Sequence, residues 1–283
     1  MKNKATLPAA KAFKWFGWTD KGKVRANNED SFLALSFDAR EIYRLGKQGE
    51  APLANADFVF AVCDGMGGAK AGEYASRIAV EKITTLLPRS FKQKATGLES
   101  GFADMLTELY AQVHKALAYL GNSYDECHGM ETTMSLGWFT PGWMYFAHVG
   151  DSRIYYLPRE GGLIQISHDH TFVGSQRRKG LMNEREARSD SRRSALQQAL
   201  GAGNQFIDPQ IGAVGHKPGD RFVICSDGVV DGLWDREVEE LARGSSSDAA
   251  VTVAKRLVTT AVQNSGRDNA TAIVVEVLEP PVA

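Results

Sequence analysis

An α+β fold with antiparallel sheets is the class that the order of apolar patterns along this chain of 283 residues predicts. Expected strands come in adjacent groups and expected helices come in pairs, whereas a doubly wound fold would alternate strand and helix. No linker divides the sequence, so we expect one domain over residues 14–283 after a flexible tail over residues 1–13.

The expected strands are short apolar runs bounded by turn residues. The run FVFAV at 58–62 predicts a strand that ends in a glycine-rich turn, VCDGMGG. Two further runs, MSLGWF and WMYFAHV, are joined by Thr140-Pro141-Gly142, which is typical of a hairpin. The other strands are expected over residues 163–167, 221–227 and 270–278.

The expected helices have apolar residues at helical spacing. The first stripe runs from Ala75 to Leu87, and Pro88 is expected to end that helix. The second helix is expected between a cap at Ser100 and a stop at Gly121. Two more are expected, one over 235–243 and one from Ala250 to Ala261 with Ser247 or Asp248 as its cap.

Two polar segments show no clean period. Asp38 to Asp57 contains Gly46, Gly49 and Pro52, and it is expected to be a loop. Residues 168–195 are rich in arginine and are expected to form a mobile flap or irregular helices. A choice between substrates would reside in such segments.

Composition and charge exclude several classes of protein. With 43% hydrophobic residues, 24% charged residues and a net charge of -1, the chain is typical of globular proteins and shows no global field for nucleic acid or membrane. Its three cysteines form no CxxC pair or zinc pattern, which indicates free thiols in a reducing compartment. No signal peptide and no run of about 18 apolar residues occurs, so we expect a cytoplasmic protein without a membrane span.

Acidic residues stand at the ends of several expected strands. Asp64 and Asp227 each end an apolar run and precede a glycine. Asp151 lies in a turn between strands, Asp268 comes just before a strand, and the pair Glu29-Asp30 precedes another. Each alone is typical of a turn, where aspartate caps local N–H groups. Together they indicate a cluster, because adjacent sheet ends can bring their carboxylates together.

Converging carboxylates would require cations. Two of them about 4 Å apart repel by roughly 4 kcal/mol at an effective dielectric constant of about 20. Such a cluster raises its own pKa values or binds cations, and all-oxygen ligands suit Mg²⁺ or Mn²⁺. The turn VCDGMGG could therefore hold a phosphate with its backbone, or hold a cation that holds the phosphate; Asp64 favours the cation.

Six short stretches identify a resemblance that covers residues 17–278. The chain resembles the metal-dependent Ser/Thr protein phosphatases, also called type 2C phosphatases, and specifically their bacterial members. The resemblance implies a four-layer α-β-β-α sandwich with two central antiparallel sheets and a dinuclear metal centre. The matching stretches, in the family's order, are VRANNEDSF, VCDGMGGAKAGE, METTMSLGWF, AHVGDSRIY, ICSDGVVDGL and GRDNATAIVV.

The resemblance also implies a set of metal ligands. Asp64 is expected to bridge two ions of Mn²⁺ or Mg²⁺, with Asp227 and Asp268 completing one ion's ligands. Glu29 and the Gly65 carbonyl are expected to serve the other ion.

Four more residues receive roles from the resemblance. Asp151, with Asp227, matches a third and weaker metal site of bacterial members. Arg25 matches the residue that pairs with the substrate phosphate. Asp30 and Asn269 adjoin ligands and are expected to support them.

The implied activity is hydrolysis of phosphoserine and phosphothreonine in proteins. A water that bridges two divalent cations becomes hydroxide near neutral pH and would attack phosphorus in line. No phosphoenzyme is expected, since no Ser, Cys or His nucleophile is needed. The expected partners are phosphorylated proteins and an opposing bacterial Ser/Thr kinase, and the chain is expected to be a monomer.

The sequence departs from the family at two positions. Met66 stands where eukaryotic members often have a histidine proposed as general acid, which leaves the proton donor unassigned. Glu131 stands where the family usually has glycine, adding an unexplained carboxylate. His168 and His170 could substitute as proton donors or ligands, although two histidines in a polar loop are more often simply exposed.

Three other functions are disfavoured. A catalytically inactive binding module of the same fold would not need the intact ligand set, and a phosphatase assay with Mn²⁺ separates the two. A two-metal nuclease or phosphodiesterase would require a basic groove. A kinase or P-loop nucleotidase would require GxxxxGK[ST], which does not occur.

Overall fold

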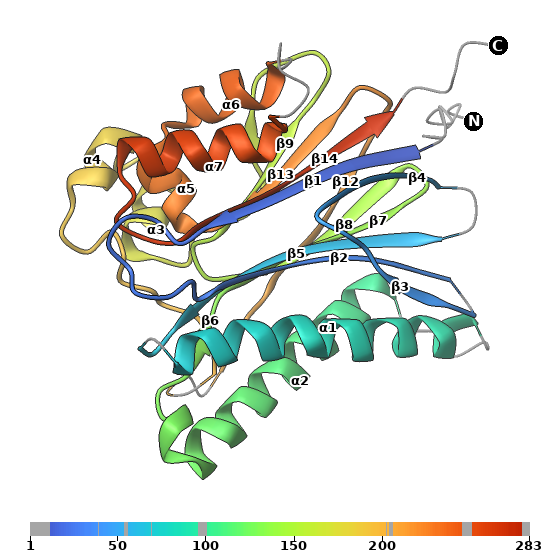
Figure 1. Ribbon diagram of the computed structural model, residues 1–283, viewed down its shortest axis with the longest axis horizontal. Helices are drawn as coiled ribbons and strands as arrows, with labels where there is room; N and C mark the ends of the chain where they lie inside the picture. The colour runs from blue at the N-terminus through green and yellow to red at the C-terminus, as the bar shows by residue number, and fades with distance from the viewer. Residues whose placement is uncertain are drawn as a thin grey trace.

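Two antiparallel sheets packed face to face, with helices on both outer sides, form the molecule in the computed structural model (Figure 1). The structure describes residues 12–278 except 39, 54–55, 69, 96–100, 202, 204–205 and 245–250. The expected four-layer α-β-β-α sandwich is confirmed. The helices of one outer layer are α1 (Ala71–Ala95) and α2 (Phe102–Ser123), and those of the other are α5 (Asp227–Gly232), α6 (Asp235–Arg243) and α7 (Val253–Asn264).

The first sheet has the strand order β10-β9-β13-β14-β1-β4. Its central strand β14 pairs with β1 along nine residues and with β13 on the other side. The strands are β1 (Ala12–Asp20), β4 (Gln48–Pro52), β9 (Arg153–Leu157), β10 (Ile164–Gln165), β13 (Arg221–Cys225) and β14 (Ala270–Leu278).

The second sheet has the order β11-β6-β5-β7-β8-β12, with β2 also paired to β5 and β3 paired to β2. The turn at Thr140-Pro141-Gly142 joins β7 and β8, as the sequence predicts, and Gly142 has a φ of 82°. The strands are β2 (Asp30–Phe37), β3 (Ile42–Arg44), β5 (Asp57–Met66), β6 (Glu131–Thr132), β7 (Met134–Thr140), β8 (Trp143–Val149), β11 (Leu200–Gly201) and β12 (Gln210–Gly215). A 3₁₀ turn, Asp125–Cys127, follows α2.

Buried aromatic rings fill the space between the two sheets. Phe13 of β1 meets Phe58 of β5 edge to face at 5.6 Å and Phe139 of β7 at 5.2 Å. Phe139 in turn meets Phe222 of β13 at 5.2 Å. Such ring pairs add stability beyond the area they bury, so they hold the two sheets in a fixed relation.

Several sequence expectations about loops and strands are corrected. Phe13, expected in the flexible tail, is fully buried in β1; residues 1–11 lie outside the described residues. The expected loop Asp38–Asp57 contains β3 and β4, in which no side chain is fully buried, so no apolar period predicts them. β4 exists because it pairs with β1.

Helix ends also differ from the expectations. α1 continues past Pro88 to Ala95, because a proline removes one backbone hydrogen bond without preventing the next turn when the helix is packed elsewhere. α2 passes Gly121 and ends at Ser123, while its expected cap Ser100 is outside the described residues. The cap of α7 is Thr252, whose hydroxyl accepts from the Lys255 N–H, and the expected caps Ser247 and Asp248 are not described.

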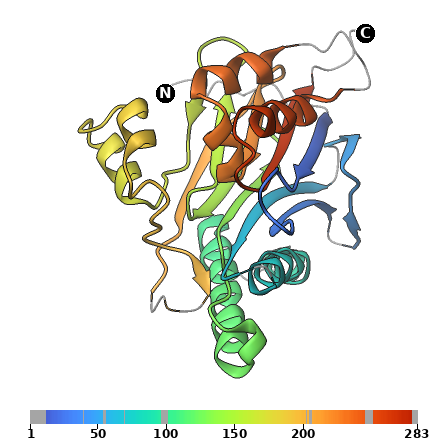
Figure 2. The ribbon, with the colours of Figure 1, turned by 60° about the vertical axis from the view of Figure 1, so that its left-hand side comes forward.

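The segment expected as a flap holds two short helices, α3 (Phe172–Arg178) and α4 (Glu184–Ser189). Figure 2 shows them in yellow, projecting from the side of the sandwich. Among the described helices none is both long and apolar enough to cross a membrane.

Candidate metal and phosphate site

Strand pairing places the first two acidic residues side by side. Asp30, which begins β2, is directly opposite Asp64 in the antiparallel register with β5. Ser226, which directly follows β13 of the other sheet, donates its hydroxyl to Asp30 Oδ2 at 2.7 Å. Burial raises the pKa of Asp30 to about 6, although hydrogen bonds from Thr271 and Ser226 oppose that shift. Asp30 thus links the two sheets at the edge where the acidic residues meet.

Asp64 and Asp227 form the buried centre of the acidic set. The Asp227 carboxyl, at the start of α5, lies within hydrogen-bonding reach of the Asp64 carboxyl. Burial, followed by the charges of Asp30 and Asp227, holds the pKa of Asp64 well above its ordinary value. Burial and the charge of Asp151 do the same to the pKa of Asp227. The structure therefore brings together residues that are 163 positions apart in the sequence.

Asp151 and Asp268 flank this centre. Burial, with a smaller contribution from the Asp169 charge, raises the pKa of Asp151 to about 7. Asp268 contributes charge to both Asp64 and Asp227, and its own Oδ2 accepts from Arg25 Nη2 at 2.6 Å. Arg25 is about half exposed and so lies at the mouth of the site.

Asn269 fixes the loop that carries Glu29. Its Oδ1 accepts from the Glu29 N–H at 2.8 Å, and its Nδ2 donates to the carbonyls of Lys21 and Asn27 at 2.9 Å. Burial raises the pKa of Glu29, and the charge of Arg25 partly opposes this shift. These contacts hold Glu29 next to Asn269, the residue that follows Asp268, although the two lie near opposite ends of the sequence.

Gly65 packs too closely against its neighbours for any side chain. A Cβ there would lie 2.0 Å from the Gly72 carbonyl oxygen of α1 and 2.9 Å from the Glu29 carbonyl oxygen. The sequence predicts a turn over VCDGMGG, but Asp64 to Met66 belong to β5, and Gly65 and Met66 pair with β6. The chain turns only at Gly67 and Gly68, which have φ angles of 113° and 90°.

The chemistry of the donors fits a hard cation. Asp30 Oδ1 and Asp227 Oδ1 are buried and have no hydrogen-bond partner among the residues that the structure describes, so two carboxylate oxygens lack a compensating positive group there. Within the described residues, however, no group of three or more acidic, histidine or cysteine side chains is arranged so that it could hold a metal ion. The oxygen-only donors and the unpaired buried atoms are the stronger indication, because an uncompensated buried carboxylate is costly.

A pocket connects this centre to the flap. Asp151 and Asp227 of the acidic centre line it together with Arg177, Arg188 and Arg193. The pocket therefore brings basic side chains close to the acidic centre.

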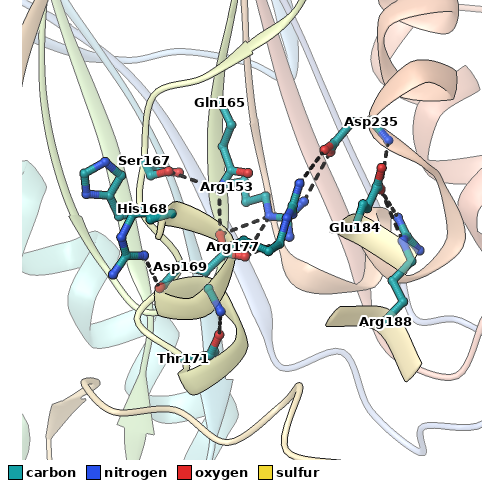
Figure 3. Close-up of polar contacts among 12 residues, drawn as sticks. Arg153, Gln165, Ser167, His168, Asp169, Thr171, Arg177, Glu184, Arg188 and Asp235 are labelled. Carbon is teal, nitrogen blue, oxygen red and sulfur yellow. Dashed lines mark hydrogen bonds and ion pairs between the residues drawn. The ribbon is translucent and has the colours of Figure 1, made fainter. Parts of the chain in front are cut away.

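An ion-pair network holds the flap in place (Figure 3). Arg153 donates to Asp169 Oδ2 at 2.7 Å and to Asp235 Oδ1 at 3.3 Å. Arg177 of α3 donates to Asp235 Oδ2 at 3.0 Å, so Asp235 connects the flap to the start of α6. Sequence reasoning missed this network, although Arg153 lies in the GDSR stretch and Asp169 lies between the two flap histidines.

The two flap histidines have different surroundings. His168 is exposed, as expected, but His170 is only partly exposed: its N–H donates to the Gly150 carbonyl at 2.7 Å, and its Nδ1 accepts from the Gly150 N–H at 3.2 Å. Burial lowers the pKa of His170 to about 4, so its ring is neutral near pH 7. His170 thus holds the backbone beside Asp151.

Comparison with known sequences identifies one family. The family profile described as protein phosphatase 2C matches residues 51–270. The serine/threonine protein phosphatase PstP of Mycobacterium tuberculosis is 32% identical over 264 residues, which cover 92% of this chain and 44% of that protein. The serine/threonine phosphatase stp of Listeria monocytogenes is 29% identical over 260 residues, which cover 91% of this chain and 93% of that one. The chain therefore spans less than half the length of PstP.

Solved structures of protein phosphatases also resemble this chain. The crystal structure of the Mycobacterium tuberculosis phosphatase PstP/Ppp superposes with a TM-score of 0.72 at 30% identity, covering 95% of this chain and 100% of that one. The catalytic domain of PstP in complex with two manganese ions superposes with a TM-score of 0.70 at 29% identity, covering 95% and 99%.

Proposed function

The chain belongs to the protein phosphatase 2C family, and on this basis we propose that it hydrolyses phosphoserine and phosphothreonine in proteins with the help of divalent cations. The observation that carries the proposal is the buried Asp64–Asp227 pair, in which both pKa values are raised and Asp227 Oδ1 has no partner. Such a pair is stable at neutral pH when a cation lies between the carboxylates.

The proposed ligand set is the one that the family resemblance implies. Asp64 would bridge two ions of Mn²⁺ or Mg²⁺, with Asp227 and Asp268 on one side and Glu29 and the Gly65 carbonyl on the other. When bound, such ions lower the pKa of a shared water so that it can attack phosphorus near neutral pH. The manganese ions in the PstP structure support the choice of metal.

Other residues would bind and orient the substrate and the ligands. Arg25, at the mouth of the site, would donate to the phosphoryl oxygens and offset their charge. Asn269 and Asp30 would keep Glu29 and the strand ends in position through the hydrogen bonds described above. Asp151, beside Asp227, would contribute to a third and weaker ion site.

We propose phosphorylated proteins as substrates and a bacterial Ser/Thr kinase as the enzyme that supplies them. The names of the relatives PstP and stp support the substrate class. We further propose that the chain acts as a monomer, because all the proposed ligands come from one chain.

The test is release of phosphate from phosphoserine, phosphothreonine and phosphotyrosine peptides with Mn²⁺, Mg²⁺ or EDTA. We expect metal-dependent release from the first two peptides. Asp227→Asn, which keeps the volume of the side chain but not its charge, should lower kcat/KM by about 10²-fold or more, since metal catalysis supplies several kcal/mol. Asp125→Asn, at an exposed position in the 3₁₀ turn after α2, is the matched control. A folded Asp227→Asn protein with full activity would refute the ligand assignment.

A further inference from the structure

Hydrolysis of a phosphoserine leaves an alkoxide that needs a proton. The side chain that supplies it must carry a proton near neutral pH and lie on the face that receives the substrate. Among the described residues around the site, Met66 has no proton to give. His148 and His170 are neutral and hold backbone groups, since burial lowers their pKa values to about 3 and about 4.

Glu131 lies on the required face. In the β5–β6 pairing Glu131 is directly opposite Met66, and side chains opposite each other emerge on the same face of a sheet. Asp64 precedes Met66 by two residues in β5 and therefore points to that face as well. Glu131 and Asp64 are thus diagonal neighbours, whose backbones are roughly 7–8 Å apart.

The surroundings of Glu131 leave its carboxyl free to exchange a proton. The side chain is partly buried, and burial raises its pKa. It forms no hydrogen bond or ion pair with the other described residues. Its Oε1 would lie 3.6 Å from a Cβ placed on Gly203, so the chain after β11 partly covers it. A partly covered carboxyl without a fixed partner is suited to give a proton and regain it from water.

We propose that Glu131 is the general acid that protonates the leaving Ser or Thr oxygen, a role that rests on the proposed phosphatase activity. As the P–O bond breaks, its electron pair stays on the Ser oxygen, and the proton of the Glu131 O–H passes to that oxygen. The products are the free hydroxyl side chain, inorganic phosphate and the Glu131 carboxylate. The carboxylate regains its proton from solvent water.

The test compares two leaving groups. A phosphoserine peptide needs a proton on its leaving oxygen, whereas para-nitrophenyl phosphate releases an anion that is stable without one. Glu131→Gln keeps the shape of the side chain but cannot give up a proton in this way. We expect Glu131→Gln to lower kcat on the peptide by about 10²-fold while the aryl ester loses far less. Glu126→Gln, at an exposed position after α2, is the matched control and should leave the peptide-to-aryl ratio of wild type.

A second measurement uses no substrate. With ¹³C-labelled glutamate side chains, the Glu131 signal, assigned by its loss in Glu131→Gln, should titrate near neutral pH and well above about 4.3, the value of an ordinary glutamate. Glu131→Asp should recover part of the peptide activity, since it restores an acidic proton on a shorter side chain.

Three results would overturn the role of Glu131. One is a folded Glu131→Gln protein whose activity falls equally on both esters, and another is a variant that loses nothing on the peptide. The third is a Glu131 signal that titrates well below neutral pH, because the side chain would then have no proton to give. A wild-type protein that releases no phosphate with any metal would instead refute the proposed function, and the general acid with it.

Discussion

Arg25 has one partner in the structure and another in the proposed reaction. Its guanidinium donates to Asp268 Oδ2 at 2.6 Å, and this hydrogen bond raises its pKa above the ordinary value. A permanently charged, half-exposed guanidinium next to an acidic centre can move from a carboxylate to a phosphoryl group, because both accept paired N–H donors. Asp268 would then be free to hold a cation.

Replacing Arg25 should weaken phosphate binding more than the chemistry. We expect Arg25→Ala to raise KM for a phosphoserine peptide by about tenfold, the equivalent of a charged hydrogen bond of about 1.5 kcal/mol. The inhibition constant of inorganic phosphate should rise with it. Arg236→Ala, whose side chain is 87% exposed, is the matched control. If Arg25→Ala changed only the Mn²⁺ concentration that the activity requires, Arg25 would position Asp268 and would not bind the substrate.

The acidic residues were predictable singly because each follows or precedes an apolar run. Asp64 and Asp227 carry this local signal, and the family resemblance assigned their roles. The partnership of Arg153 with Asp169 carries no such signal, because an irregular segment separates the two residues. The spacing of apolar residues does not predict which part of the structure an irregular segment contacts.

The flap helices α3 and α4 are tethered to the sandwich by a few charged contacts. Asp235, the first residue of α6, accepts from Arg153 and from Arg177 of α3. Arg188 of α4 stacks on Trp234 at 4.3 Å. Helices of six or seven residues have little stability of their own, so these contacts determine the position of the flap.

Removing the shared acceptor should loosen the flap without unfolding the sandwich. We expect Asp235→Asn to cost about 1–3 kcal/mol locally, because two guanidinium groups lose a charged acceptor. Amide exchange over residues 172–189 should accelerate by about tenfold or more, which corresponds to about 1.4 kcal/mol, while the buried strand β14 stays protected. Glu240→Gln on the same helix, in an exposed pair with Arg236, is the control. Unchanged exchange in the flap would show that the ion pairs do not hold it.

A strand or helix could be predicted from the sequence when its buried apolar residues recur at a regular spacing. The hairpin β7–β8 and strand β14 bury most of their side chains, so both were expected from sequence. The strand β4 has no such period, since it exists through backbone pairing with β1. In β1 itself buried Phe13 and Trp15 alternate with half-buried residues, a signal that the neighbouring lysines concealed.

At the scale of the molecule, the sandwich gathers acidic residues from both ends of the chain at one edge. Glu29 and Asn269 are 240 positions apart and are joined by a hydrogen bond of 2.8 Å. Apolar periodicity alone predicted an α+β fold, and the resemblance was needed to predict four layers. The register between strands that are distant in the sequence depends on how their side chains pack together. A local pattern of apolar residues therefore does not predict that register.

The same convergence makes the stability of the whole molecule depend on pH and on metal. Burial raises the pKa of Asp30 to about 6 and that of Asp151 to about 7, and it raises those of Asp64 and Asp227 further above their unfolded values. A group with a raised folded pKa stabilises fully below its unfolded pKa, and this stability is lost as pH rises through the folded pKa. For Asp30 alone the loss is on the order of 3 kcal/mol.

We therefore expect the melting temperature in EDTA to fall by several degrees between about pH 5 and pH 8, since each kcal/mol is worth roughly 2–4 °C in a chain of this size. At pH 8 added Mn²⁺ should reverse the fall, because it binds the deprotonated folded state, and about 2.7 kcal/mol is gained at a hundredfold excess over Kd. At pH 5 the gain should be smaller, because protons compete for the same oxygens. Asp227→Asn should reduce both effects, whereas Asp125→Asn should leave them as in wild type. A melting temperature in EDTA that rises over this range, or one that Mn²⁺ does not change at pH 8, would contradict an acidic cluster built to hold cations.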